Sequence, residues 1–550
     1  MSTLSSSARA VAAAAACVSI ALATAMPVSG AASAAVPVGG DSRPEQVLSP
    51  APLDLGAPGL PEKRTVERLS PGVILTRIVR GDNDPVSWVV EFNIPPGPKS
   101  LEPEGSARSI QDYDAAAAQA AKLSATGATA RVEAVRQVGA VDVADQVLGY
   151  RVRLQTSFDT KAEADAALAD LTPNGFTGRS WYSGWDGMSA AKGPWTVDVI
   201  TIDPKSFTGA LAATHGADIV RRETTSALTE SAGAIAGVNA GFFVFDPTAG
   251  AEGDPAGIGV YSGRVLSENV GERPALVFDA SGKGSAVARP VWRGSLKTSS
   301  GRVALDGLNR VPGLIRNCGG TGDTPTDQAV HDMTCTDADE LVLFTSEFGA
   351  STPKGAGAEI VVDDSGKVVS IAATRGVALK AGQQSVQATG DLAGVLGTVK
   401  PGEKVRLDSA VSVDGAPLKL GKGTHVVNGG PLLVKNGRIE ITQNADGMWR
   451  PFDASFAYGW VQQRNPRTFA GIDARGRTHL VTVAGRQVGH LGLSIPETAR
   501  LAKGLGLRDA LNLDGGGSTA TVAKGRLLTS VSDAAGERGV GDAIVVVPKR

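Results

Sequence analysis

The stretch 510–522, ALNLDGGGSTATV, joins an apolar run to three consecutive glycines and then to hydroxyl residues. The apolar run predicts a strand that ends at Asp514. The three glycines that follow can adopt positive φ angles and let backbone N–H groups approach a ligand closely. A tight turn in which Asp514 bonds its own backbone would need fewer glycines. The stretch therefore predicts a functional loop in which a carboxylate lies beside an anion site.

The length and charge of the chain narrow the classes of protein to consider. Its 550 residues allow two or three domains, and 42% hydrophobic residues suffice for a packed core. The formal net charge of −2 gives no electrostatic reason to expect nucleic acid or an anionic membrane as a partner. The 69 glycines and the short β-branched runs favour a turn-rich β or α/β protein.

The N-terminal residues 1–34 have the features of a secretory signal peptide. Arg9 precedes an apolar stretch at 10–25, and Ala32-Ser33-Ala34 is a cleavage site of the A-x-A type. A membrane anchor is the alternative, but the stretch is short and weakly apolar, and no later segment has the roughly twenty apolar residues of a spanning helix. We therefore expect a secreted protein, extracellular or associated with the cell wall, without a membrane span after signal removal.

Two cysteines remain once Cys17 leaves with the signal. Cys318 and Cys335 form an even pair in an exported protein and enclose a polar, Gly-rich loop, which predicts a disulfide. Zinc binding by the two thiolates and His331 is the alternative, although a fourth ligand at close spacing is missing.

Residues 35–186 divide into a linker and a small domain. Residues 35–80 are rich in Pro, Gly and Ser and are interpreted as a linker. Residues 81–186 alternate strand and helix patterns in the order β-α-β-β-α-β, and Thr160 and Glu163 form a capping box for the second helix. This order predicts a ferredoxin-like domain.

The second half of that unit, GYRVRLQTSFDTKAEADAALADL followed by GFTGRSWYSG, resembles the SPOR family. The shared features are an aromatic residue at the start of the strand, an F-D-T helix start and a closing Gly-aromatic strand. The resemblance implies binding to peptidoglycan glycan strands. A protease-inhibitor-like or purely structural prodomain of the same fold is the alternative.

Residues 193–550 are predicted to form one large β-rich α+β domain with few helices, because short strand patterns recur throughout. The clear helix is SIPETARLAKGLG, in which Ser494 and Glu497 form a capping box and Gly506 ends the helix.

Other Asn-Gly and Arg motifs accompany the glycine loop. VNAGFF (238–243) and VVNGGPLLV (426–434) each place an asparagine at the end of a strand, as common hairpin signals also do. A pocket of Asn side chains and bare backbone suits the hydroxyls of a sugar. RNPRTFAGI (464–472) supplies arginines, whose forks match a phosphate group.

In this order, VNAGFF, VVNGGPLLVKNGR, RNPRTFAGIDARGRTHLVTVAGR, NLDGGGSTATV and ERGVGDAIVV resemble the phosphodiester glycosidase family over roughly 230–550. The resemblance implies hydrolysis of a sugar-1-phosphodiester at the anomeric carbon. The motifs and the resemblance together predict these substrate-binding residues: Asn239, Gly241, Asn428, Arg467, Thr468, Gly515, Gly516, Gly517, Ser518 and Arg538.

For catalysis, Asp514 is predicted to act as base or nucleophile on an oxocarbenium-like centre. Glu537 and Glu497 are the candidates for a second carboxylate, although Glu497 also completes a capping box. No cofactor is required by this chemistry, but a divalent metal on Asp514 and backbone oxygens remains an alternative. The rival functions are a non-catalytic carbohydrate-binding protein of the cell wall and a phosphodiesterase that cleaves the P–O bond.

Overall fold

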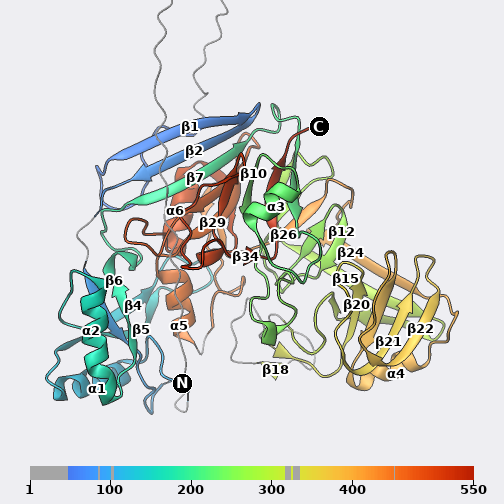
Figure 1. Ribbon diagram of the computed structural model, residues 1–550, viewed down its shortest axis with the longest axis horizontal. Coiled ribbons are helices and arrows are strands. Elements are labelled where there is room, and N and C mark those ends of the chain that lie inside the picture. The colour runs from blue at the N-terminus through green and yellow to red at the C-terminus, as the bar shows by residue number, and fades with distance from the viewer. Residues whose placement is uncertain are drawn as a thin grey trace, which may run out of the picture. The chain divides into compact units, whose positions relative to one another are not determined.

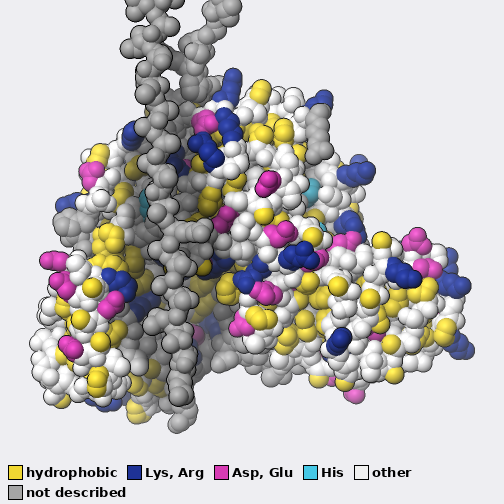
Figure 2. All heavy atoms as spheres, in the orientation of Figure 1, with side chains coloured by type: hydrophobic (Ala, Val, Ile, Leu, Met, Phe, Trp, Pro, Cys, Tyr) yellow, Lys and Arg dark blue, Asp and Glu magenta, His cyan; other side chains and the backbone are white. Residues whose placement is uncertain are grey.

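The computed structural model describes residues 48–83, 87–100, 105–315, 324–325, 335–450 and 453–549. The predicted signal peptide and Cys318 lie outside these residues, and residues 44–550 form one compact unit. None of the helices in the described ranges is long and apolar enough to cross a membrane. Figure 2 shows basic side chains scattered among acidic ones over the visible face, which agrees with the near-neutral net charge.

A sheet of eight strands, which differ in length, forms the centre of the fold (Figure 1). Its order is β1 (Glu62–Ser70), β2 (Val73–Arg80), β7 (Trp195–Ile202), β30 (Thr478–Val483), β29 (Arg467–Asp473), β31 (Leu507–Asn512), β27 (Leu432–Lys435) and β28 (Arg438–Ile439). Both faces are buried, since neighbouring residues Phe469 and Ala470 of β29 belong to different apolar clusters. Strands β29 and β30 are buried along almost their whole length, although both contain polar residues.

The linker interpretation of residues 35–80 is wrong at its C-terminal end. Residues 62–80 form the hairpin β1–β2, and β2 pairs along its whole length with β7. The Pro-rich composition before residue 62 concealed the apolar run VILTRIV, in which most side chains are buried. The large domain therefore begins before residue 81, and the small domain is an insertion between β2 and β7.

The inserted unit contains four antiparallel strands in the order β4-β5-β3-β6, with helices α1 and α2 connecting them. The elements are β3 (Trp88–Phe92), α1 (Tyr113–Ala125), β4 (Ala130–Gln137), β5 (Gln146–Leu154), α2 (Lys161–Leu171) and β6 (Gly178–Tyr182). Asp112 caps α1, and the predicted Thr160–Glu163 capping box of α2 is present. Assignment of this unit to the ferredoxin-like class remains a prediction.

Two five-stranded sheets pack against the second face of the central sheet, and the described residues also contain two short strand pairs. The first contains β33 (Arg526–Leu527), β32 (Thr521–Ala523), β10 (Ala236–Asn239), β35 (Ala543–Val547) and β8 (Ala210–Thr214). The second contains β12 (Arg264–Ser267), β11 (Gly259–Tyr261), β26 (His425–Asn428), β13 (Ala275–Phe278) and β14 (Ser285–Ala288). The pairs are β34 (Gly539–Val540) with β9 (Glu223–Thr224), and β18 (Thr324–Pro325) with β19 (Cys335–Thr336).

The remaining sheets share a separate core, which includes Trp292 and Leu343, with the sheet of β26 through Val426. One contains β16 (Gly301–Leu305), β15 (Pro290–Thr298), β24 (Arg406–Val413) and β25 (Ala416–Pro417). The other contains β17 (Gly307–Leu308), β20 (Leu341–Thr345), β23 (Gln384–Ala388), β21 (Gly355–Val362) and β22 (Val368–Arg375).

Helices are few, as the sequence predicted. Besides α1 and α2 these are α3 (Thr225–Ser231), α4 (Ala393–Gly397), α5 (Ala454–Ala457) and α6 (Ile495–Gly504). The predicted capping box of α6 is present, and the helix packs on β27 and β31. Its Ile495 and Leu501 bury one face of the central sheet.

Candidate active site

The loop after Asp514 lies where the central sheet meets the sheet of β10. The Leu513 N–H donates to the Thr468 carbonyl at 2.9 Å, and the Asp514 N–H donates to the Ala240 carbonyl at 2.9 Å. Thr468 belongs to β29 of the central sheet, and Ala240 directly follows β10 of the neighbouring sheet. The loop is therefore fixed from both sides at its first residue.

Asn239 and Thr468 hold this loop from below. Both are fully buried. The Asn239 side-chain amide donates to the Asp514 carbonyl at 2.7 Å and accepts from the Thr468 hydroxyl at 2.6 Å and the Ala520 N–H at 3.2 Å. Both side chains therefore support the loop. The sequence analysis had predicted that they would contact the substrate.

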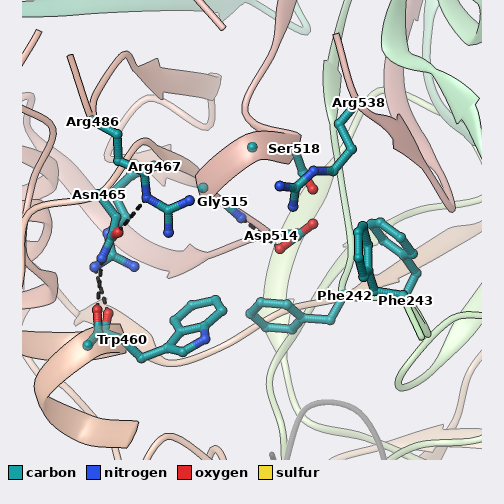
Figure 3. A pocket seen from close by; sticks show the side chains of 14 residues that line it. Phe242, Phe243, Trp460, Asn465, Arg467, Arg486, Asp514, Gly515, Ser518 and Arg538 are labelled. Atoms are coloured by element: carbon teal, nitrogen blue, oxygen red, sulfur yellow. Dashed lines mark hydrogen bonds between the residues drawn. The ribbon is translucent and has the colours of Figure 1, made fainter. Parts of the chain in front are cut away.

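Above this support is a pocket of about 240 Å³ (Figure 3). Its lining residues are Phe242, Phe243, Phe245, Gly459, Trp460, Asn465, Arg467, Arg486, Asp514, Gly515, Gly516, Gly517, Ser518 and Arg538. Asp514 supplies the carboxylate, and arginines and aromatic rings supply most of the other side chains. The glycine loop that the sequence singled out is thus a wall of a pocket.

Each glycine of the loop has its own steric requirement. A Cβ on Gly515 would lie 2.8 Å from the Pro466 carbonyl oxygen. Gly516 has a φ of +60°, and its Cβ would lie 3.2 Å from the Arg486 guanidinium group. On Gly517 the Cβ would lie 2.1 Å from Arg538 Nη2. The glycines therefore let two guanidinium groups lie against the backbone.

Two of the three glycine amides of the loop are already hydrogen-bonded within the protein, so the loop does not offer the full anion site that the sequence predicted. The Gly515 N–H donates to the Asp514 Oδ1 atom at 2.8 Å, and the Gly516 N–H donates to the Pro466 carbonyl at 2.9 Å. The Ser518 hydroxyl is buried and has no hydrogen-bond partner among the described residues. Among the donors predicted on the loop, the Ser518 hydroxyl is therefore still available to bind a ligand.

We expect Gly517→Ala to displace Arg538. The added Cβ must push the guanidinium group and its partner Asp533 aside, because Asp533 Oδ1 would lie only 2.4 Å from it. Overpacking of this kind costs about 1–3 kcal/mol of unfolding free energy. Chemical denaturation measures the cost. Gly489→Ala is the control, because Gly489 like Gly517 has no positive φ and a Cβ there meets no atom within 4 Å.

Arg538 lies at one side of the pocket, next to Asp514 (Figure 3). Its Nε donates to Asp533 Oδ2 at 2.7 Å, and its guanidinium carbon lies 5.1 Å from the centre of the Phe245 ring. The guanidinium group is half-buried, so it is held in place and still accessible. Its position agrees with the predicted role in substrate binding.

Arg486 was missed by the sequence analysis. Its Nε donates to the Asn465 Oδ1 atom at 2.9 Å, and no salt bridge to it is found among the described residues. The Arg486 side chain is exposed at the pocket, but the protein atoms around it desolvate the guanidinium group and, followed by repulsion from Arg538, lower its pKa, while Asp514 acts in the opposite direction. Arg486 follows strand β30 in the motif VAGR. Its position just after a strand is the sequence feature from which a site residue could have been predicted.

Arg467 lines the pocket, but its guanidinium group points elsewhere. Nε donates to the Leu493 carbonyl at 2.8 Å and Nη2 to the Trp460 carbonyl at 2.7 Å (Figure 3). Burial and the charge of Arg486 lower the pKa of Arg467 to about 9, so the group is still protonated at neutral pH. Arg467 therefore fixes the Trp460 segment and is not the open phosphate fork that the sequence predicted.

Aromatic rings close the other side of the pocket. Phe242 and Trp460 meet edge to face with ring centres 5.6 Å apart. Phe245 is 46% exposed. Phe242 is positioned by Asn428, whose side chain accepts from the Phe242 N–H at 2.9 Å and donates to its carbonyl at 3.2 Å. Asn428 is buried and supports the wall; it does not line the pocket.

Gly241 allows this contact, because a Cβ there would lie 2.6 Å from Asn428 Nδ2. Its N–H donates to Asp542 Oδ1 at 2.8 Å, and the Tyr261 hydroxyl donates to the other oxygen at 2.8 Å. Burial raises the pKa of Asp542 to about 6. Gly241 is thus a support position, and sequence reasoning missed Asp542.

The two proposed second carboxylates lie outside the pocket. Glu497 is buried, pairs with Arg464 at 2.7 Å and accepts from the Ser494 and Met188 N–H groups. Glu537 accepts from the Ser226 N–H at 2.9 Å and lines a neighbouring hollow. This geometry does not support a catalytic role for Glu497 and leaves Asp514 as the carboxylate that lines the pocket.

The metal and disulfide predictions are not resolved by the site geometry. Within the described ranges, no group of three His, Cys, Asp or Glu side chains is placed to hold a metal ion. Cys335 is fully buried. Its predicted partner Cys318 lies outside the described residues, so the disulfide remains a prediction.

Comparisons with known proteins relate the chain to one family model and to several solved structures. Residues 356–547 match the phosphodiester glycosidase (NAGPA) family. This range includes Arg467, Arg486, Asp514 and Arg538, whereas the Phe242–Phe245 wall lies outside it. No curated protein matches the chain.

The crystal structure of a "Putative exported protein" from Burkholderia pseudomallei K96243 is similar over nearly the whole length. It is 33% identical with a TM-score of 0.79, and the match covers 91% of this chain and 99% of that chain. A hypothetical protein from Synechocystis shares the fold, with 17% identity, a TM-score of 0.50 and coverage of 90% and 83%.

The catalytic domain of zebrafish N-acetylglucosamine-1-phosphodiester α-N-acetylglucosaminidase matches at 12% identity and a TM-score of 0.33, over 66% of this chain and 80% of that chain. At this level the match adds no argument to those above. The chain belongs to the same family as the Burkholderia protein, and its residues 356–547 form a match to the phosphodiester glycosidase family.

Proposed function

We propose that this protein is a secreted phosphodiester glycosidase that removes a sugar from a sugar-1-phosphodiester by hydrolysis at the anomeric carbon. The observation that supports it most is the pocket in which the Asp514 carboxylate faces inward while Arg486 and Arg538 approach the same loop (Figure 3). The family match over residues 356–547 supports this reaction class.

The arrangement divides the chemistry between two kinds of group. Arg486, Arg538 and the Ser518 hydroxyl would bind the phosphate, whose negative charge grows as the anomeric C–O bond breaks. Asp514 would act on the sugar side of the scissile bond, either by attacking the anomeric carbon or by taking a proton from the water that attacks it. The Phe242 and Trp460 rings would pack against the sugar.

A single carboxylate is sufficient for this scheme. The group that leaves is a phosphomonoester anion, a weak base, so it needs little help from a general acid, unlike an alcohol leaving group. The absence of Glu497 and Glu537 from the pocket lining is therefore compatible with hydrolysis. If Asp514 is the nucleophile the sugar retains its configuration, and if it activates water the configuration inverts.

Incubation of the purified protein with a panel of sugar-1-phosphodiesters tests the proposal. We expect release of free sugar and a phosphomonoester. In ¹⁸O-labelled water the label should enter the sugar; label in the phosphate would identify a phosphodiesterase that cleaves the P–O bond. Binding without release from any substrate would favour the non-catalytic carbohydrate-binding alternative.

We expect Arg486→Ala to lower kcat/KM by about 100-fold or more, the usual effect of losing a donor that stabilises developing charge. Arg486→Lys should recover part of this loss, because the charge is kept and the fork is not. Initial rates on a cleaved diester measure both. An equal loss in Arg526→Ala, whose exposed side chain lies on β33, would show that the effect is not specific to the pocket.

For the inserted unit we propose attachment to peptidoglycan, on the basis of its SPOR-like sequence and the predicted signal peptide. Sedimentation of the protein with purified peptidoglycan tests this. The protein should co-sediment, whereas a protein that stays in the supernatant would indicate the structural alternative.

A further inference from the structure

A second hollow, of about 530 Å³, lies at the far end of the central sheet. It is lined by the β1–β2 hairpin, the turn after β7 and the turn between β29 and β30. We infer that this hollow is a second phosphate-binding site, separate from the candidate active site. Its lining residues include Arg68, Lys205, Arg475 and Arg477.

Two of these arginines are presented by a rigid turn. The Asp473 carboxylate accepts from the Arg475 N–H at 2.8 Å, the Arg477 N–H at 3.0 Å and the Arg477 Nε at 2.7 Å. His479 Nε2 lies 3.3 Å from the same carboxylate, and these hydrogen bonds hold the pKa of Asp473 well below its usual value although burial acts against them. Asp473 thus orders the turn that presents both arginines.

The turn after β7 is built in the same way. The Asp203 carboxylate accepts from the Lys205 N–H at 2.9 Å, and the Asp203 N–H donates to the Gly72 carbonyl at 2.8 Å. Gly72 has a φ of +76°, and a Cβ there would lie 2.4 Å from the Phe207 nitrogen. The hairpin and the turn are therefore in close contact at the wall of the hollow.

Arg68 comes from strand β1, where the register with β2 is irregular between Arg68 and Ser70. Irregularities of this kind redirect side chains. Among the described residues no salt bridge is found for Arg68, Lys205 or Arg475, whereas Arg477 pairs with Asp473. Unpaired cations collected around one hollow favour an anion in it.

The charge balance of the lining is positive. Arg477 is paired with Asp473, so three other cationic side chains face one lining carboxylate, Asp203, whose Oδ1 atom already accepts from its own turn. The chain as a whole has a net charge of −2, so this excess is local. Guanidinium forks match phosphate oxygens in pairs, and the flexible Lys205 adds a point charge. Phosphate is therefore the chemical group that we assign to the site.

Strand β29 connects the two sites, with Arg467 at the catalytic pocket and Asp473 at the second hollow. Its seven residues span about 20 Å, which is too far for one phosphate to reach both. The second site can therefore be occupied independently of catalysis. It could be filled by free phosphate or by a phosphate of a longer polymer.

Calorimetric titration distinguishes these sources and tests the site. The probes are inorganic phosphate and a poly(glycerol phosphate) oligomer, titrated into protein carrying Arg486→Ala to weaken binding at the catalytic pocket. Adding Arg68→Ala and Arg475→Ala should weaken binding about tenfold or more, because charge-assisted hydrogen bonds are lost. The matched control adds Arg302→Ala and Arg406→Ala, two exposed arginines of the β15 and β24 sheet region.

Tighter binding of the oligomer than of inorganic phosphate would assign the site to a polymer, and the reverse to free phosphate. Equal binding by the Arg68/Arg475 variant and the control would overturn the site. The variant should also keep the wild-type rate on any small diester that is cleaved when Arg486 is intact. Since titration needs no turnover, failure of the proposed glycosidase activity would leave this result interpretable.

Discussion

Asp514→Asn should lower kcat/KM for a cleaved sugar-1-phosphodiester by about 100- to 10,000-fold, the range expected when an acid–base group is lost. The asparagine oxygen can still accept from the Gly515 N–H, as Asp514 Oδ1 does at 2.8 Å. The Asn239 support is unaffected because it binds the backbone carbonyl of Asp514. The loop should therefore stay in place while the reacting carboxylate is removed.

The loss should appear in kcat, with binding of the diester largely preserved, since the arginines that would hold the phosphate are untouched. Single-turnover rates measure the chemical step, and calorimetry on the inactive variant measures binding of the diester, so the two effects are separated. Asp509→Asn is the matched control, because Asp509 lies on the same strand β31 and contacts Asn436 and Lys435 outside the pocket. If both variants hydrolyse the diester at the wild-type rate, Asp514 is not the reacting group.

The sequence located the functional loop but assigned the wrong partners to it. A strand followed by Asp514 and three glycines is a local pattern, and the loop does line the pocket. The reason for the glycines is not local, because it depends on the approach of Arg486 and Arg538 from other parts of the chain. We predicted bare amides as the anion donors, and two of them are already hydrogen-bonded within the protein.

The same distinction explains the other differences. Asn239 and Asn428 were recognised as polar residues at strand ends, but only the fold shows that their side chains bond the backbone and that Thr468 donates to the Asn239 side chain. Trp460 gave no signal in the sequence, since it reaches the pocket through a π-helical turn. Local patterns thus predicted which segments matter, whereas tertiary contacts determine which atoms face the pocket.

The inserted unit contacts the segment that carries Trp460. The Tyr458 hydroxyl donates to Glu91 Oε2 at 2.9 Å and accepts from Arg151 at 3.0 Å. At the other end of the turn, Gln462 donates to Gln137 of β4 at 2.9 Å. The π-helical turn Tyr458–Gln462 between these contacts contains Gly459 and Trp460, which line the pocket. The unit therefore supports one wall of the candidate active site.

Glu91→Gln tests this support and should lower the unfolding free energy by about 3–5 kcal/mol, the cost of removing one partner from a buried ionic cluster. Glu91 is 1% exposed and pairs with Arg153 at 2.8 Å and Arg179 at 2.6 Å. The variant leaves Arg153 buried with fewer partners. Glu163→Gln, at the exposed capping box of α2 in the same unit, is the control and should cost about 1 kcal/mol or less.

The dependence on pH gives the prediction a second readout. Burial alone would raise the pKa of Glu91, but Arg179, Arg153 and Arg151 outweigh burial and hold the pKa below its usual value of 4.5. A lowered pKa in the folded state adds stability above pH 4.5 that is lost as the pH falls through the folded-state pKa. The gap between wild type and Glu91→Gln should therefore be full at pH 7 and narrow below pH 4.5 in chemical denaturation.

Activity should respond as well, because the Glu91→Gln variant keeps one acceptor oxygen where Tyr458, Arg153 and Arg179 share two in the wild type. We expect KM for a cleaved diester to rise more than kcat falls, since Trp460 packs on the substrate and Asp514 is not moved. Tyr458→Phe should reproduce the KM change with a smaller loss of stability, as it leaves the Glu91–Arg153 pair intact. A Glu91→Gln variant as stable as Glu163→Gln at pH 7, with unchanged KM, would mean that the inserted unit does not support the pocket wall.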